Sequence, residues 1–244
     1  MRWIYLSPHL DDAVLSCGGL IREQTLSSTQ VEIWTICSGD SPDGSLSPFA
    51  NLQHTQWGIG ADASTIRRAE DIAACQIICA RHRHLPFLDC IYRKSTDGNW
   101  LYPSEESIFG QLVVEDAAMI YTLQTFLATI LKHDDVMVIP LTIGNHVDHQ
   151  LVRKAAEGLG RPLLYYADVP YVIKHPEKVI EATYNFDSQL YNFPLLSLAF
   201  WQKSIQAYRS QLDVLFKGEE NMYSIINLYY QKEKGLRLWR QSNF

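Results

Sequence analysis

The chain of 244 residues is 47% hydrophobic and 20% charged, so it can build a sizeable core and is not globally disordered. Its 21 Lys and Arg against 27 Asp and Glu give a net charge of −6, which leaves no basic surplus for binding a nucleic-acid backbone. No apolar run reaches the ~18 residues of a membrane span, and the N-terminus lacks a signal-peptide pattern. Five cysteines without a CxxC pair are typical of reduced thiols. We expect a cytoplasmic globular protein.

The first ninety residues alternate strand-like and helix-like patterns. Short apolar or β-branched runs predict strands, and apolar side chains at three- and four-residue spacing predict helices. In chain order we expect a strand at 3–6, a helix opening at 13–21, a strand at 31–37, a polar loop at 38–60, a helix at 62–80 and an edge strand at 85–88. The loop is long enough to be a lid, although a solvated loop around Trp57 is the simpler expectation.

A second unit of the same kind follows. We predict a helix at 118–133, a buried strand at 136–140, a polar loop at 144–149, a helix at 150–157, a strand at 163–167 and a helical, aromatic region from 195 onward. Strands that alternate with helices favour a mostly parallel sheet with helices on both faces. The sequence therefore predicts one α/β domain with a Rossmann-like sheet, spanning residues 1–244.

Two polar clusters directly follow predicted strands. His9, Asp11 and Asp12 come after the first strand, and His146-Val147-Asp148-His149 comes after the strand at 136–140. Ligands in open α/β sheets bind beyond the carboxyl ends of strands, so we expect both clusters to face one crevice. Three His and three Asp suit a divalent ion, most often zinc at a catalytic site. Each cluster alone could be a helix cap with a solvated side chain, but two at equivalent positions favour a metal site.

One metal ion does not need all six candidate side chains. A catalytic zinc keeps about three protein ligands and one open position, so the remaining groups would do acid–base work. The neighbours Asp11 and Asp12 can point in different directions, one to the metal and one to its water. Asp148 could orient a histidine through a ring N–H. Such a set of groups is what hydrolysis needs.

Five segments carry a resemblance to a known family. Ser7-Pro8-His9-Leu10-Asp11-Asp12, followed by Gly18-Gly19, closely resembles the Pro-His-Pro-Asp-Asp signature of the PIG-L/LmbE-like N-deacetylases, and residues 146–149 resemble their His-Pro-Asp-His motif. Arg67-Arg68-Ala69-Glu70 resembles their Arg-x-x-Glu segment, and Leu88-Asp89 looks like another family position. Ala207-Tyr208-Arg209-Ser210-Gln211 also looks like a family segment, so the likeness extends from residue 3 to about 213. The ordered set is more specific than either short motif.

The resemblance implies a zinc-dependent hydrolase. Its substrate would be a small molecule, a sugar conjugate of the N-acetylglucosamine type from which the N-acetyl group is removed. By the family pattern, Zn²⁺ or another divalent ion is bound by His9, Asp12 and His149. The oligomeric state does not follow from the resemblance.

The same resemblance implies roles for the other polar residues. Asp11 would be the general base that takes a proton from the metal-bound water. His146 would stabilise the tetrahedral intermediate or protonate the leaving amine, with Asp148 orienting it. Arg67 or Arg68, together with Asp89, falls where the family binds sugar hydroxyls.

The chain departs from the family pattern at three positions. Leu10 and Val147 replace the two motif prolines, which alters loop rigidity but removes no ligand. Gly144 stands where some members carry a tyrosine that helps the oxyanion. Tyr165, Tyr166 or a residue of the lid would have to substitute for it, or the contact is missing.

Other functions fit the sequence less well. One alternative within hydrolases is the same machinery acting on a different amide or N-acyl group. A catalytically weak sugar-binding or regulatory protein with this fold would not need Asp11 beside the metal ligands. A nucleotide-binding Rossmann module is disfavoured because no GxGxxG follows the first strand.

Overall fold

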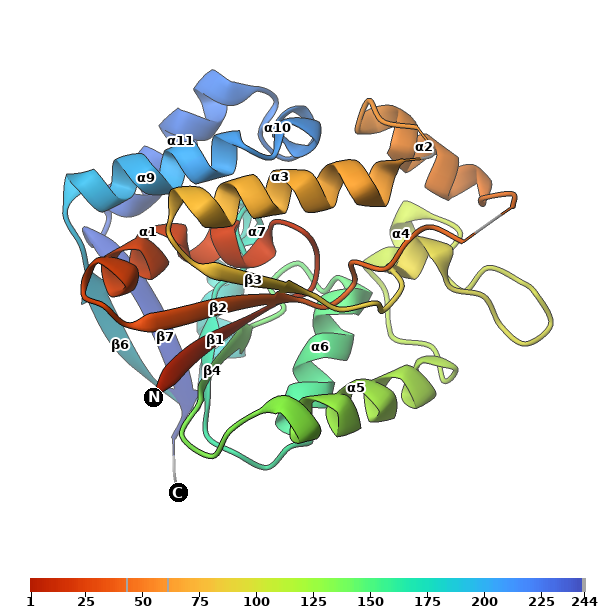
Figure 1. Ribbon diagram of the computed structural model, residues 1–244, viewed down its shortest axis with the longest axis horizontal. Coiled ribbons are helices and arrows are strands. Elements are labelled where there is room, and N and C mark those ends of the chain that lie inside the picture. Colours follow the sequence, from red (N-terminus) through yellow and green to blue (C-terminus); the bar gives the residue numbers. More distant parts are fainter. Residues whose placement is uncertain (43, 61, 243–244) are drawn as a thin grey trace.

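The computed structural model describes residues 1–42, 44–60 and 62–242 (Figure 1). Over these residues the chain forms a seven-stranded sheet in the order β3-β2-β1-β4-β5-β7-β6. The strands are β1 (Arg2–Ser7), β2 (Gln30–Thr35), β3 (Arg81–His84), β4 (Val136–Pro140), β5 (Leu163–Tyr166), β6 (Phe186–Asn192) and β7 (Gly235–Gln241). From β3 to β5 all neighbours pair in parallel, whereas β7 and β6 add an antiparallel edge. The predicted α/β class with a mostly parallel sheet is confirmed.

Helices cover both faces of this sheet. In Figure 1, α1, α3 and α9 lie on one face and α5 and α6 on the other. The helices are α1 (Asp12–Leu26), α2 (Pro48–Gln56), α3 (Ala63–Ile77), α4 (Glu105–Ile108), α5 (Asp116–Ile130), α6 (Val147–Glu157), α7 (Tyr171–Lys174), α8 (Glu177–Ala182), α9 (Leu195–Gln206), α10 (Arg209–Phe216) and α11 (Glu219–Gln231), with a 3₁₀ turn η1 at Cys90–Tyr92. Within the described ranges, no helix is both long and apolar enough to cross a membrane.

The main core lies on both faces of the sheet, and on one of these faces α1 packs against α9. Two glycines of α1 allow α9 to approach closely. A Cβ atom at Gly18 would lie 2.5 Å from Cδ1 of Trp201, and one at Gly19 would lie 2.5 Å from Cε2 of Phe193. Both aromatic rings are buried, and the indole N–H of Trp201 donates to the carbonyl of Val14. The small residues after the first motif therefore fix α1 against α9, and with it the loop that precedes α1.

A second, smaller hydrophobic cluster docks α2 onto the body of the protein. It contains Phe49 and Ala50 of α2 together with Ile91, Tyr92 and Val147. The polar segment at 38–60 is thus not a simple loop, because its second half folds into a helix with a buried side. Ser47 begins this helix by accepting a hydrogen bond from the backbone N–H of Ala50, and Pro48 occupies its first turn.

Three predicted elements differ from the observed ones. The edge strand is Arg81–His84 rather than 85–88, because an edge exposed to solvent accepts charged side chains, whereas Pro86 cannot donate to the ladder. The helix α6 begins at Val147, three residues before the predicted helix. The C-terminal region is not only helical, since β6 and β7 pair there and join the sheet at β5.

Candidate active site

Polar residues gather beyond the carboxyl ends of three adjacent strands, β1, β4 and β5. Residues 9–12 follow β1 and lead into α1, residues 146–149 follow β4 and begin α6, and Asp168 follows β5. β1 and β4 are also the strands between which the strand order reverses, which is where open α/β sheets have their ligand crevice. The two predicted clusters therefore meet at one site.

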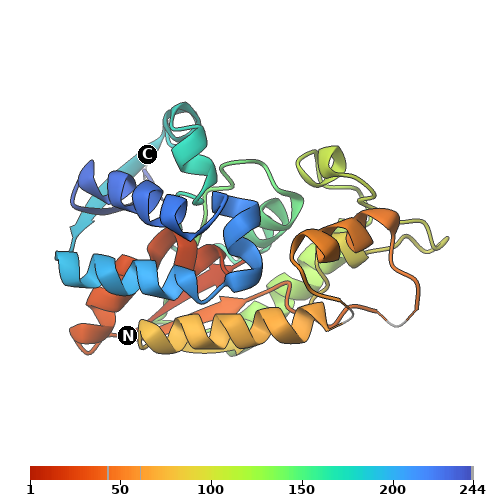
Figure 2. The ribbon, with the colours of Figure 1, turned by 90° about the horizontal axis from the view of Figure 1, so that it is seen from above.

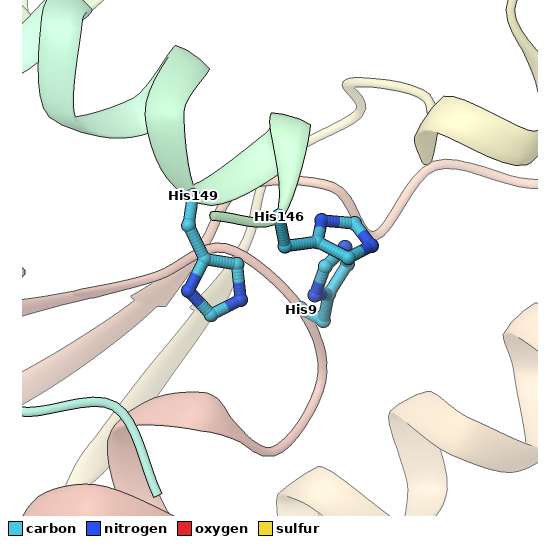
Figure 3. A group of neighbouring side chains, drawn as sticks. All are labelled: His9, His146 and His149. Atoms are coloured by element: carbon cyan, nitrogen blue, oxygen red, sulfur yellow. The ribbon is translucent and has the colours of Figure 1, made fainter. Parts of the chain in front are cut away.

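Three histidines converge at this site. Figure 3 shows His146 and His149 projecting from the start of α6 toward His9. One nitrogen from each ring lies within 4.8 Å of the others, so a single ion could touch all three. The carboxylate of Asp12 contacts two of them, with 3.2 Å from Oδ2 to Nδ1 of His9 and 3.3 Å from Oδ1 to Nε2 of His149. Of the three residues predicted as ligands, Asp12 therefore contacts both His9 and His149, while the third converging ring is that of His146, which the sequence does not predict as a ligand.

Two of the histidine rings use one nitrogen to contact Asp12 and the other nitrogen to contact a second buried carboxylate. Nδ1 of His149 lies 2.7 Å from Oδ1 of Asp168, and Nε2 of His9 lies 3.0 Å from Oδ2 of Asp148. Metal-binding histidines usually have such a carboxylate partner, which fixes the ring and raises its basicity. Asp168 was not singled out as a site residue by the sequence, because it is one acidic residue after a strand without a motif around it.

The charge distribution fits a divalent cation. Burial disfavours the imidazolium of His149, but the carboxylates of Asp12 and Asp168 outweigh it and raise the pKa of His149 to about 9. Burial likewise disfavours the charged ring of His9, yet Asp12 and Asp148 raise its pKa well above the usual range. A field that stabilises two imidazolium ions here also stabilises a metal cation. Two imidazoles and a carboxylate are donors that suit zinc.

Replacing Asp168 with Asn should weaken zinc binding by about 10- to 100-fold, the usual effect of losing such a partner. Asn can still accept the hydrogen bond that Asp168 receives from the backbone N–H of Ile143, so the fold should survive. Competition with a chelator measures the affinity. Asp135→Asn removes an equally buried carboxylate that pairs with Arg2, and zinc affinity should not change. Equal affinities in Asp168→Asn and the unaltered protein would refute the role of Asp168.

Asp11 lies next to the metal-binding group, and its backbone N–H donates to the carbonyl of His9, but among the described residues its carboxylate has no hydrogen bond or ion pair with the three histidines. It is buried, and its Oδ2 lies 3.5 Å from Nη2 of Arg67. Burial, followed by the charge of Asp12, raises the pKa of Asp11 to about 7, although Arg67 opposes the shift. A carboxyl group with a pKa near neutrality is a suitable proton acceptor.

The histidine His146 is held as a neutral hydrogen-bond donor. Its Nδ1 accepts a hydrogen bond from the backbone N–H of Asp148 at 3.2 Å, which leaves the ring proton on Nε2. Burial and the nearby charge of His9 lower the pKa of His146 well below its usual value. The expected orientation of His146 by Asp148 therefore arises through the backbone of Asp148, while its carboxylate contacts His9.

A buried arginine balances the charge of Asp148. Nη1 of Arg93 lies 2.6 Å from Oδ1 of Asp148, and its Nε lies 3.1 Å from Oδ1 of Asp116. Burial would raise the pKa of Asp148, but Arg93 and His9 outweigh burial and lower it well below the ordinary value. Asp148 thus stays ionised behind His9. Arg93 sits in a loop with no recognisable motif, so the sequence offered no signal for it.

A cavity of about 580 Å³ opens onto these groups. Its walls include Asp11, His146, Arg67 and Asp89, two of which are predicted sugar-binding residues. The third, Arg68, points elsewhere, because its guanidinium binds the carbonyl of Ser38 and the exposed carboxylate of Asp40. The geometry therefore separates the two neighbouring arginines and places Arg67 at the cavity.

The space above Gly144 is filled by a tyrosine from another element. Gly144 has φ +98°, and a Cβ atom there would lie 2.6 Å from Cγ of Tyr171. Tyr171 begins α7, lines the cavity and meets the ring of His149 edge-on. The two tyrosines considered from the sequence face other partners, with the Tyr165 hydroxyl at Glu157 and the Tyr166 hydroxyl at the carbonyl of Leu6. Tyr171 is the tyrosine at this position of the site.

The fold and the site together define an α/β enzyme with a candidate metal centre at its strand switch point. Residues 4–159 match the PIG-L family, described as GlcNAc-PI de-N-acetylase. This match includes more than half of the chain, and the chain belongs to this family. The resemblance seen in the sequence is confirmed, and with it the assignment as a deacetylase.

Named relatives agree with this assignment. The chain is 26% identical over 270 aligned positions to 2'-N-acetylparomamine deacetylase of Niallia circulans, covering 98% of this chain and 93% of that protein. It is 29% identical over 191 positions to the protein of the same name from Streptomyces fradiae, covering 75% of this chain and 62% of that protein. The crystal structure of a zinc-inhibited form of a teicoplanin deacetylase matches with a TM-score of 0.81 at 26% identity, covering 100% of this chain and 99% of that one. These names disfavour a sugar-binding or regulatory protein without catalysis.

Proposed function

We propose that this protein is a zinc-dependent hydrolase that removes the N-acetyl group from a sugar conjugate of the N-acetylglucosamine type. One observation carries the proposal. His9, Asp12 and His149 converge at the switch point of the sheet, and a carboxylate of raised pKa, Asp11, lies beside them. A metal site with a separate base is the arrangement that hydrolytic metalloenzymes use.

His9, Asp12 and His149 would hold the zinc ion, which when bound polarises a carbonyl and acidifies water. Asp11 takes the proton from the attacking water, because its carboxylate faces the cavity and is ionised above a pKa near neutrality. The attack converts the amide carbon to a tetrahedral centre, and its oxygen acquires the negative charge. Collapse of this centre breaks the C–N bond and releases acetate, with a proton delivered to the sugar amine.

His146 stabilises the tetrahedral centre by donating a hydrogen bond from Nε2. The ring keeps its proton on Nε2 because Nδ1 accepts from the backbone N–H of Asp148. A neutral donor held in place before the reaction needs no reorganisation as charge develops on the substrate oxygen. Because the neutral ring would become an anion if it gave up this proton, the leaving amine receives instead the proton that Asp11 took from the attacking water.

Tyr171 supplies a second donor at the cavity. Burial, together with the carboxylates of Asp12 and Asp11, raises the pKa of Tyr171, so its hydroxyl stays protonated. Tyr171→Phe should lower kcat by about 10²-fold, as removal of one oxyanion donor does, with zinc content unchanged. The ring remains over Gly144, so packing is kept. Steady-state kinetics measure the effect, and Tyr121→Phe on the exposed side of α5 is the control. A Tyr171→Phe enzyme with normal kcat would exclude the hydroxyl from catalysis.

The substrate class is inferred from the cavity wall and from the relatives. Arg67 and Asp89 present a guanidinium and a carboxylate, groups that pair with sugar hydroxyls. The relatives are named as deacetylases of 2'-N-acetylparomamine and of teicoplanin. We therefore propose an N-acetylated amino sugar on an aglycone, with Arg68 outside the binding site.

Acetate release tests this proposal. Zinc-loaded protein is offered N-acetylglucosamine, its α- and β-conjugates, the corresponding N-acetylgalactosamine conjugates and acetylated amines that lack a sugar. We expect release from N-acetylglucosamine conjugates and none from the acetylated amines. Release from the simple amides alone would refute the sugar assignment, and release from no acetylated compound would refute the proposed function.

A further inference from the structure

We propose that His54 and Trp57, at the end of the α2 segment, are positioning residues for substrate recognition. They hold the guanidinium of Arg67 at the wall of the cavity. The inference rests on the proposed function to the extent that Arg67 binds the sugar. α2 lies at the end of the molecule opposite the two chain termini (Figure 2), and Trp57 lines the same cavity as Asp11 and His146.

A stack of three side chains connects α2 to α3. The ring of His54 is stacked on the indole of Trp57 with 5.5 Å between centroids and 28° between planes. The Cζ atom of Arg67 lies over the same indole at 4.6 Å from its centroid. A guanidinium over an indole face is a cation–π contact, and desolvation strengthens it. Arg67 is buried, so the contact is largely shielded from water.

The same histidine ties the stack to the segment that carries Asp89. Nε2 of His54 lies 2.5 Å from the hydroxyl of Tyr92, which belongs to η1. Asp89 caps this short turn by accepting a hydrogen bond from the backbone N–H of Ile91. Arg67 is thus in direct contact with Trp57, whereas Asp89, 22 residues further along the chain, is connected to α2 only through η1 and the contact of Tyr92 with His54.

The guanidinium of Arg67 has capacity left for a ligand. One of its nitrogens, Nη2, faces Asp11 at 3.5 Å, which is a loose contact. Its Nε is buried, and among residues 1–42, 44–60 and 62–242 it has no hydrogen-bond acceptor. A buried donor without a partner costs free energy unless a ligand or water accepts from it. The indole fixes the plane of the guanidinium, and because Arg67 lines the cavity, a sugar oxygen bound there can accept from this guanidinium.

The docking of α2 explains how this contact is maintained. Phe49 and Ala50 anchor the helix in the smaller hydrophobic cluster, away from the main core. Trp57 follows directly after the last turn of α2, so its place depends on this docking. Loss of the indole should therefore release Arg67 while leaving the main core and the histidine cluster unchanged.

A double-mutant cycle tests whether Trp57 acts through Arg67. We expect Trp57→Ala to lower kcat/KM by between about 2-fold and 30-fold, mainly through KM, which is the range of cation–π contacts. Trp57→Phe, which keeps a ring, should restore part of this loss. Combining Trp57→Ala with Arg67→Met should be no worse than Arg67→Met alone. Leu52→Ala, on the exposed side of α2, is the control, and zinc content should be equal in all variants.

Two outcomes would overturn the proposal: full kcat/KM in Trp57→Ala, or losses in the double variant that multiply. The second would mean that Trp57 contacts the substrate directly.

If the unaltered protein releases no acetate, the proposed function fails, and the placement of Arg67 is then tested by NMR. The Arg67 Nε–H resonance, identified by its loss in Arg67→Met, should shift in Trp57→Ala and not in Leu52→Ala. A resonance that stays in place in Trp57→Ala would contradict the stack.

Discussion

Asp11→Asn should lower kcat by about 10²- to 10⁴-fold while the zinc content stays equal to that of the unaltered protein. The amide has the size of the carboxylate but cannot accept a proton. Because the carboxylate of Asp11 is separate from the contacts that Asp12 makes with His9 and His149, its loss should leave the ligands in place. Kinetics with the best N-acetylglucosamine conjugate and elemental analysis of the same preparation measure both quantities.

The pH dependence gives a second test of Asp11. Only the ionised carboxylate can act as base, so kcat/KM should fall as the pH drops through the Asp11 pKa. Burial and Asp12 raise this pKa to about 7 in the chain alone, and a bound cation would lower it. The acidic limb should therefore lie below neutrality and disappear in Asp11→Asn. An unchanged limb and rate in the variant would assign the base to another group.

His149→Ala should abolish metal binding and with it the activity. This ring contacts the carboxylate of Asp12, another predicted ligand, through Nε2 and the carboxylate of Asp168 through Nδ1. A catalytic zinc has about three protein ligands, and the loss of one leaves too few to retain the ion against a chelator. Dialysis against a chelator, followed by elemental analysis, measures the retained zinc.

A second histidine variant controls for nonspecific loss of metal. His84 lies on the edge strand β3 and pairs with Asp71, away from the three converging rings. His84→Ala should keep its zinc and its activity. Full zinc occupancy in His149→Ala, or an equal loss in both variants, would show that His149 is not a ligand.

The position of the site could be predicted from the sequence because its parts are local. Each polar cluster directly follows a buried apolar strand, and parallel strands end at the same edge of a sheet. His9 and Asp12 are three residues apart, and His146 and His149 are again three apart at the start of a helix. Residues that are only three positions apart in the chain face the same crevice as soon as the local backbone turn is formed.

The partners of the supporting residues could not be predicted because the contacts are long-range. The sequence predicts Asp148 as a partner of His146 but not of His9. Asp148 reaches His9 across 139 residues, and Asp168 follows a different strand from either motif. The role of Arg93 becomes visible only in the structure, where its guanidinium pairs with the carboxylates of Asp116 and Asp148. Arg67 lines the cavity and Arg68 does not, because the two side chains point in different directions from α3. Two adjacent arginines in a sequence do not reveal which of them faces the cavity.

Two features of the fold were missed for different physical reasons. The edge strand β3 has the sequence RHRH, and its pairing with β2 comes from backbone hydrogen bonds rather than from an apolar face. In β7 the alternation of buried Leu236 and Leu238 with the half-buried Arg237 is a strand signal that was available. Its aromatic and helical surroundings obscured it.

The most direct test of the account is a zinc titration of metal-stripped protein with acetate release as the readout. The substrate is the N-acetylglucosamine conjugate that the loaded protein hydrolyses best. We expect no release without metal, and a rise with each addition up to about one zinc per chain. Full release by the metal-free protein, or no release at any zinc concentration, would contradict a zinc-dependent deacetylase built on His9, Asp12 and His149.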